Sequence, residues 1–207
     1  MAKPAYISLS KLQAVRKAAI VPLLLIGLAV IAVTQATRFG QNVHEWIEYV
    51  GIGLIAICIL GRCWCSLYIG GKKVRELITN GPYSIVRNPL YFFSFLGAAG
   101  VGAQSGSLLI AAVCVLLCWI VFATVVSKEE KALIEVHGET YAAYLKSTPR
   151  FLPNPWKWHD KDEMLVQPDR VVQTFADGLF FLLAIPLAEY AEHLQQAGVL
   201  PVLMNLP

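Results

Sequence analysis

The stretch GPYSIVRNPLYFF, Gly81–Phe93, joins a polar turn to an apolar segment. It holds Arg87 and Asn88 between two prolines and then continues directly into aromatic and aliphatic residues. Proline at these positions is typical of a turn, so the sequence predicts a loop that ends where an apolar helix begins. Ionisable side chains at such a boundary are candidates for a functional site when they face a shared cavity.

The composition on both sides of this stretch is that of a membrane protein. Of 207 residues, 57% are hydrophobic and 15% are charged, whereas soluble domains carry about 25% charged residues. The formal net charge is only +3 and most basic residues flank apolar runs, which fits a membrane surface and excludes a nucleic acid partner. The five cysteines lie in apolar runs without a nearby histidine or acid, so we expect buried thiols and no metal site.

Apolar runs of membrane-spanning length recur along the chain. A span needs about 20 mostly apolar residues. The third of the five expected segments is too short to cross the membrane alone, and the fifth carries polar residues and a proline. The expected segments are 18–36, 46–69, 90–103, 108–126 and 171–190. The sequence therefore predicts an all-α, polytopic membrane protein with four or five spans.

Basic residues precede the first expected span and follow the second and the fourth. Because cytoplasmic loops carry the excess of lysine and arginine, the N-terminus, the 70–89 loop and the segment 127–169 are expected in the cytoplasm. The membrane is the bacterial inner membrane or the endoplasmic reticulum, depending on the source. The single membrane domain, 1–207, is expected to consist of a helix pair, a core and a tail, at 17–70, 71–155 and 156–207.

The segment that follows the fourth expected span, 128–146, is interpreted as an amphipathic helix interrupted by Gly138. The third and fourth spans are expected to form one hairpin. The residues before the third span and those after the fourth span, where this helix begins, therefore lie at the same membrane face. Glu129 and Glu130 should therefore lie near Arg87. Carboxylates suit a cationic or hydroxyl-rich ligand, arginine suits a carboxylate or phosphate, and tyrosines can stack on a ring or enclose a cation. S-adenosylmethionine carries partners for all of these groups, but the residue types alone do not single it out.

Three motifs within 59–155 occur in the order found in a known family. Arg62-x-Trp64 is followed by Gly70. GPYSIVRNPLY is similar to a GPYxxVRHPxY signature, and EEKALIEVHGETYAAYLKSTPRFLP is similar to an EExxLxxxFGxxYxxYxxxxPRFxP tail. The chain thus resembles the integral-membrane methyltransferases of the isoprenylcysteine carboxyl methyltransferase type and their phospholipid methyltransferase relatives. It departs from them at Asn88, where the best-known members have histidine, and at His137, where phenylalanine is usual.

The resemblance implies a cytoplasmic S-adenosylmethionine pocket between the 78–91 loop and the helix that begins at Glu129. The substrate is implied to be lipophilic and to arrive from the bilayer lipids. Its acceptor group would be a prenylcysteine-like carboxylate, a lipid amine or a thiol. The residues implied for catalysis are Glu130 and Arg150, and those implied for cofactor binding are Gly81, Tyr83, Val86, Arg87, Asn88, Tyr91, Glu129, His137 and Tyr144.

Other interpretations stay open at this point. An NADPH-dependent sterol-type reductase is the alternative enzyme, and a lipid-binding membrane protein is the alternative without catalysis. Arg62 can be an ordinary side chain that extends to the membrane surface, or it can face a cavity. Trp156 and Trp158 are expected to be interface anchors, and His159 is expected on the surface.

Overall fold

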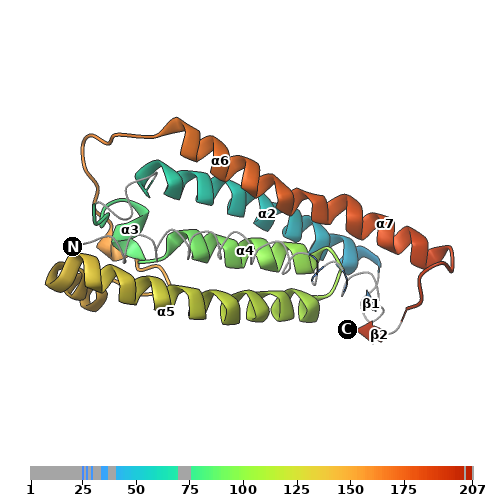
Figure 1. Ribbon diagram of the computed structural model, residues 1–207. Coiled ribbons are helices and arrows are strands. Elements are labelled where there is room, and N and C mark those ends of the chain that lie inside the picture. The colour runs from blue at the N-terminus through green and yellow to red at the C-terminus, as the bar shows by residue number, and fades with distance from the viewer. Residues whose placement is uncertain are drawn as a thin grey trace.

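The computed structural model describes residues 41–69, 76–202 and 204–206, together with 34–36 and the single positions Leu25, Gly27 and Ala29. Helices dominate this part of the chain and lie side by side along one axis (Figure 1). The elements are β1 (Thr34–Ala36), α2 (Gln41–Ile69), α3 (Pro82–Ile85), α4 (Pro89–Ala103), α5 (Leu108–Ser147), η1 (Pro155–Lys157), α6 (Pro168–Leu179), η2 (Phe180–Leu183), α7 (Ala184–Gln196) and β2 (Met204–Leu206).

Three helical stretches among the described residues are long and apolar enough to cross a membrane, judged by length and composition: Asn42–Ile69, Leu108–Ser147 and Pro168–Gln196. The helix α4 is also apolar but shorter, as expected from its sequence. Most of the expected first span, 18–36, lies outside the described residues. Its expected end is wrong, because Thr34–Ala36 forms the strand β1 and pairs in parallel with β2. The described residues are therefore helical apart from this short ladder. Their three long apolar stretches contain the expected second, fourth and fifth segments, and the total of four or five spans stays a prediction.

Small residues bring α2 and α4 into close contact at the centre of the bundle. A Cβ atom on Gly51 would lie 2.9 Å from the carbonyl oxygen of Gly100, and one on Gly100 would lie 2.6 Å from that of Gly51. The two backbones can approach this closely because neither position carries a side chain. On its other side α2 packs against α6, while α5 packs against α4 (Figure 1). The order α6, α2, α4, α5 places the α4–α5 hairpin at one edge of the bundle.

The helix α5 does not stop where the expected fourth span ends. It continues past Val126 and turns back only at Gly138, whose backbone has φ 56° and ψ −130°. The expected interruption at Gly138 is confirmed. The fourth span and the first part of the expected amphipathic helix form one continuous helix up to Gly138, and the rest of that helix follows the kink. After the turn, Tyr141 and Tyr144 pack against Ala132 and Leu133. The chain thus folds back on itself at the end of the bundle where α3 lies (Figure 1).

The C-terminal rod of α6, η2 and α7 covers α2 along its length (Figure 1). It contains the expected fifth segment, 171–190, within a longer helical stretch. The four residues of η2 are a 3₁₀-helix that comes shortly before Pro186. A proline inside a helix lacks a donor and its ring crowds the carbonyl four residues earlier, which accounts for the local change in winding. Gly178 in α6 lets this rod contact Ile59 of α2.

All five cysteines are free, and Cys58, Cys65 and Cys118 are buried. Cys58 belongs to the apolar core formed by α2, α4, α5 and the C-terminal rod. Cys118 packs with Phe122 and Tyr91 between α4 and α5. The expectation that these thiols serve packing is confirmed for these three.

Candidate active site

Four segments converge at the end of the bundle where α5 folds back. They are the loop with α3, the start of α4, the section of α5 on both sides of Gly138, and the extended segment that follows α5. Backbone hydrogen bonds hold them together: Arg87 N donates to Pro149 O at 2.9 Å, and Asn154 N donates to Ile85 O at 2.9 Å. The two motifs expected to meet, one before the third span and one after the fourth, do so here.

Glu130 lies between two arginines from different segments. Its Oε2 is 2.8 Å from Arg150 Nη2 and its Oε1 is 3.5 Å from Arg87 Nε. Glu130 and Arg87 are largely buried, whereas Arg150 is 34% exposed. Charge-assisted contacts of this kind gain strength away from water. The three residues therefore form a polar cluster at the edge of an apolar bundle, and Arg150 is its solvent-facing member.

Each guanidinium is also positioned by neighbouring polar groups. Arg87 Nη1 donates to the carbonyl oxygen of Leu145 at 3.1 Å, and Arg150 Nη2 donates to Ser127 Oγ at 2.8 Å. Asn88 Nδ2 donates to the carbonyl oxygen of Arg150 at 3.2 Å. Asn88 thus fixes the backbone that presents Arg150. As an amide it has no basicity near neutral pH, so it holds position and does not accept a proton.

Glu129 is next in sequence to Glu130 but has a different environment. Its side chain is 1% exposed. Successive helical residues point about 100° apart, so the two carboxylates cannot address the same point. Directly before the kink at Gly138, His137 has a ring nitrogen, Nε2, that is shielded from solvent and has no hydrogen-bond partner within the described part of the chain.

Tyrosines form one wall beside this polar cluster. Tyr144 Oη donates to the carbonyl oxygen of Tyr83 at 2.6 Å, which ties the segment after Gly138 to α3. The rings of Tyr141 and Tyr144 lie 5.9 Å apart. Tyr91 is 2% exposed and packs 4.7 Å from Phe122 between α4 and α5. The hydrogen bond from Tyr144 therefore holds this tyrosine wall in place, while Tyr91 belongs to the core beneath it.

The segment after η1 closes over the other side of α3. Gly81 N donates to the carbonyl oxygen of His159 at 2.8 Å, and Tyr68 Oη donates to Asp160 Oδ2 at 2.5 Å. The hydrogen bond from Tyr68 holds the pKa of Asp160 below its ordinary value, with a further contribution from the Lys161 amide. Trp158 stacks on Trp64 at 5.7 Å. We call residues 156–160 the strap.

Both tryptophans of the strap are exposed, Trp156 at 95% and Trp158 at 46%, and Trp158 also stacks on Trp64 of α2. Their role as interface anchors stays a prediction. His159 has an exposed side chain, as expected, but its backbone is bonded to the 81–84 turn. A Cβ atom on Gly81 would collide with the Tyr68 ring, so this position needs glycine for space as well as for its φ of 58°. Gly81 lies under the strap and Val86, which is 1% exposed, lies in the interior.

Three polar residues at this end were not assigned to the site from the sequence. Arg62 does not extend to the surface: it is 9% exposed and its Nη1 donates to Ser94 Oγ at 2.6 Å. Ser127 and Asp160 each contact a residue of the site from a distant part of the chain. A serine at the end of an apolar run and an aspartate in a charged tail are common in many settings, so only the fold gives them a role.

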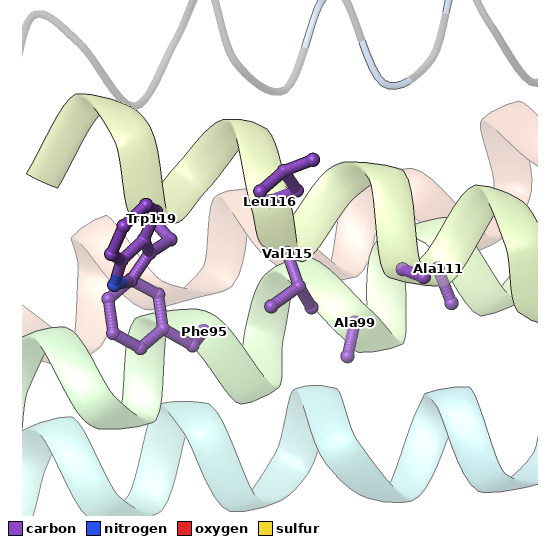
Figure 2. Close-up of a pocket in the computed structure, with 7 residues that line it drawn as sticks. Phe95, Ala99, Ala111, Val115, Leu116 and Trp119 are labelled. Carbon is purple, nitrogen blue, oxygen red and sulfur yellow. The ribbon is translucent and has the colours of Figure 1, made fainter. Parts of the chain in front are cut away.

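An apolar groove lies between α4 and α5, on the part of the hairpin nearer its turn. Its volume is about 450 Å³ and only apolar residues line it. Phe95 and Trp119 mark one end and Ala111 the other (Figure 2). Phe95 also contacts Phe151, with ring centroids 5.5 Å apart, and the guanidinium carbon of Arg150 lies 5.6 Å from the Phe151 ring. Two ring contacts thus connect the groove to the polar cluster.

Comparison with known proteins places the chain in a family. The phospholipid methyltransferase family model matches residues 49–140. The chain is 31% identical over 183 residues to the nickel-cobalt-cadmium resistance protein NccN of Alcaligenes xylosoxydans xylosoxydans, covering 86% of this chain and 85% of that protein. It is 33% identical over 167 residues to the cobalt-zinc-cadmium resistance protein CzcN of Cupriavidus metallidurans, covering 81% and 77%.

A more distant relative is the protein-S-isoprenylcysteine O-methyltransferase of Schizosaccharomyces pombe, 31% identical over 90 residues, which covers 42% of this chain and 38% of that enzyme. No solved structure gives a significant match. The matched family region contains the signature turn, α4 and α5 as far as residue 140, and so it includes Arg87 and Glu130 of the polar cluster, while Arg150 lies beyond it. The chain therefore belongs to the phospholipid methyltransferase family of membrane proteins, as the motifs in its sequence indicated.

Proposed function

We propose that this protein transfers a methyl group from S-adenosylmethionine to a lipophilic acceptor that reaches the site from the bilayer. The observation that carries the proposal is the polar cluster of Arg87, Glu130 and Arg150 beside an apolar groove. Membership in the phospholipid methyltransferase family supports the reaction class. The orientation predicted from the basic residues would expose this end to the cytoplasm, where the cofactor is available.

The donors and acceptors present fit the cofactor. Its carboxylate would pair with a guanidinium, and its ammonium or ribose hydroxyls would bond Glu129 or Glu130. The shielded Nε2 of His137 offers one more polar partner at this end. The remaining residues proposed to hold it come from the signature turn and the tyrosine wall, and they are Gly81, Tyr83, Asn88 and Tyr144, with Val86 and Tyr91 supporting them from the buried layer beneath.

When bound, the cofactor supplies an electrophilic methyl group on a sulfonium. Positive charge fades in such a displacement, so the residues need not stabilise an oxyanion. Their main task is to align donor and acceptor and to exclude water. Arg150, at 34% exposure, is placed to hold an anionic acceptor, and a carboxylate or thiolate acceptor would need no base. An amine or hydroxyl acceptor would have to pass its proton to Glu130 or His137, since Asn88 cannot take it.

The apolar groove can bind the lipophilic part of the substrate. Trp119 and Glu130 both lie on α5, about 16 Å apart along the helix axis. An acyl or prenyl chain in the groove would therefore put its polar end near Arg150, past Phe95 and Phe151. We propose that the acceptor group is attached to a chain of at least this length.

The test uses the full chain in lipid nanodiscs with S-adenosylmethionine labelled on its methyl group. Binding is measured by calorimetry, and transfer is measured as label in the organic phase after addition of a membrane lipid extract. We expect saturable binding of S-adenosylmethionine but not of NADPH, and labelled product that Glu130→Gln reduces and Glu135→Gln does not. Glu135 is the matched control because it is an exposed residue of α5. Binding of NADPH instead would favour the reductase, and binding of neither would favour a lipid-binding protein.

The two relatives that match along most of the chain are named for resistance to divalent metals. We propose that methylation by this chain also contributes to resistance to divalent metals. A metal-sensitive bacterial host that expresses the chain should tolerate more cobalt or cadmium than the same host expressing Glu130→Gln. Equal tolerance of the two strains, with active enzyme in the first, would separate the methyl transfer from resistance.

A further inference from the structure

A second cluster of ionisable residues lies at the opposite end of the bundle. His44 is in the first turns of α2, and about 36 Å of helix separate it from Tyr68, which contacts the strap. His44 Nε2 is 3.1 Å from Glu48 Oε1 and 3.2 Å from Glu192 Oε1. Glu192 comes from α7, so 148 residues of sequence separate it from His44. Such a distant pairing gives no local motif, which is why the sequence led us to expect no metal site.

One ring nitrogen serves two carboxylates in this cluster. A single N–H on Nε2 can form one well-directed hydrogen bond, so the imidazole cannot donate a good hydrogen bond to both carboxylates at once. Glu189, one turn before Glu192, adds a further negative charge near Glu48. Within the described part of the chain, no lysine or arginine forms an ion pair with Glu48 or Glu192. The cluster therefore has an excess of negative charge.

The geometry suits a metal ion. Each of the three residues offers one ligand atom, and these atoms all lie within 4.8 Å of one another. Zinc binds imidazole nitrogen and carboxylate oxygen at about 2.0–2.2 Å, so tetrahedral ligands stand roughly 3.3–3.6 Å apart. The side chains are 22%, 28% and 35% exposed, which leaves a side open for water or for exchange of the ion.

The surrounding structure fixes the histidine. Gly106, in the turn between α4 and α5, has φ 66°, and a Cβ atom there would collide with the His44 ring. Gln104 Nε2 donates to the carbonyl oxygen of Glu48 at 3.2 Å and joins the end of α4 to α2. Support of this kind holds a ligand ring in one orientation.

We propose that His44, Glu48 and Glu192 form a binding site for a divalent transition-metal ion such as Zn²⁺ or Co²⁺. Imidazole favours these ions, whereas Mg²⁺ and Ca²⁺ prefer sites made of oxygen ligands alone. With three protein ligands and an open side, the site would hold an exchangeable ion. The proposal does not rest on the methyltransferase function.

The experiment uses full-length protein without a histidine tag, in nanodiscs and stripped with EDTA. Co²⁺ is titrated while its visible absorption is recorded, and bound Zn²⁺ is counted by mass spectrometry. We expect one ion per chain, at least tenfold weaker binding in His44→Ala and in Glu192→Gln, and binding within twofold of the original in His193→Ala. His193 is the matched control because it is an exposed histidine on the same helix as Glu192.

Several results would overturn the proposal. They are no saturable Co²⁺ or Zn²⁺ binding by the unaltered chain, unchanged binding in Glu192→Gln, or displacement of the bound ion by excess Mg²⁺. Glu192→Gln keeps the shape of the side chain, so it remains informative if His44→Ala does not fold. S-adenosylmethionine binding, measured on the same preparations, should be equal in all variants, and its absence would count against the methyltransferase alone.

Discussion

The two ends of the bundle carry ionisable clusters that differ in charge balance. At the signature turn, two arginines share Glu130, and Glu129 is close by, so cations and carboxylates are equal in number. At the other end, one imidazole stands between two carboxylates. A balanced cluster can be stabilised by the chain itself and still exchange partners with a zwitterionic ligand. An unbalanced cluster is stabilised only when a cation arrives, so the two ends should respond differently to substitution.

The largest expected effect follows from removing the charge of Glu130. Glu130→Gln leaves Arg87 and Arg150 without their shared carboxylate, and charge-assisted bonds at such sites contribute about 1.5–3 kcal/mol. We expect turnover or cofactor affinity to fall by about 10- to 100-fold. The measurement is steady-state methyl transfer. Glu192→Gln, the same change at the other end, should leave methyl transfer within twofold, and an equal loss in both variants would contradict the division of roles.

Glu129→Gln should reduce activity to a similar extent but in a different way. Because the two carboxylates point in different directions, one variant should mainly raise the KM for S-adenosylmethionine and the other mainly lower kcat. Kinetics at varied cofactor concentration separates these effects. If both variants keep the original binding and turnover, the two carboxylates only form structural contacts within the bundle and the methyltransferase site lies elsewhere.

The next effect concerns Gly138, where α5 folds back and forms the end of the bundle that carries the signature turn. Gly138→Ala puts a side chain on a backbone with φ 56°, which costs about 1–3 kcal/mol. No atom lies within 4 Å of the new Cβ, so the cost arises from the backbone alone. We expect the Tm in detergent to fall by about 3–10 °C. Gly53→Ala is the matched control, since its Cβ also meets nothing but its backbone is helical, and it should leave stability unchanged or raise it slightly.

Asn88 tests whether the amide only positions Arg150. Asn88→Leu removes the donor to the carbonyl oxygen of Arg150, and an unpaired buried acceptor costs about 1–3 kcal/mol. We expect cofactor affinity to fall by about tenfold or more in Asn88→Leu and by less than about tenfold in Asn88→His, which keeps a donor. Calorimetry measures both. Equal affinities for the original chain and Asn88→Leu would exclude this side chain from the site.

A smaller effect is expected in the groove. Ala112→Phe fills part of the space between α4 and α5 with a ring. The KM for the lipophilic acceptor should rise by about three- to tenfold, because burial of a few methylene groups is lost. Affinity for S-adenosylmethionine should not change. Acceptor kinetics that match the original chain would show that the substrate uses another path.

The smallest effect concerns the strap. Asp160 is exposed, and its pKa is lowered by the bond from Tyr68, so its contribution is present at neutral pH and is lost as the pH falls below the ordinary carboxyl value. Asp160→Asn should speed hydrogen exchange of the 156–160 peptide at neutral pH. The exposed Asp162→Asn should not. Identical exchange in the two variants would show that the strap is held by Trp158 and the backbone instead.

Several features could be predicted from the sequence because they depend on local patterns. Apolar runs gave the long helices, and the closeness of Arg87 to Glu130 followed from the hairpin between them. The sequence predicted helix on both sides of Ser127 and the break at Gly138, but not that the helix runs continuously past Val126, because the apolar run ends there. The sequence left open whether Arg62 extends to the surface or faces inward, and the structure decides this because its partner Ser94 lies on another helix.

The sequence by itself determined the membrane class, the family motifs and the positions where the backbone turns, since hydrophobic length, glycine and proline act locally. Only the tertiary structure decided which polar groups meet. Arg150 bonds Ser127, the strap covers Gly81, and His44 faces Glu192, although each pair is far apart in the chain. The physical reason is that these contacts depend on how close the helices pack and how far α5 folds back. Small residues such as Gly51 and Gly100, and one turn at Gly138, set those distances.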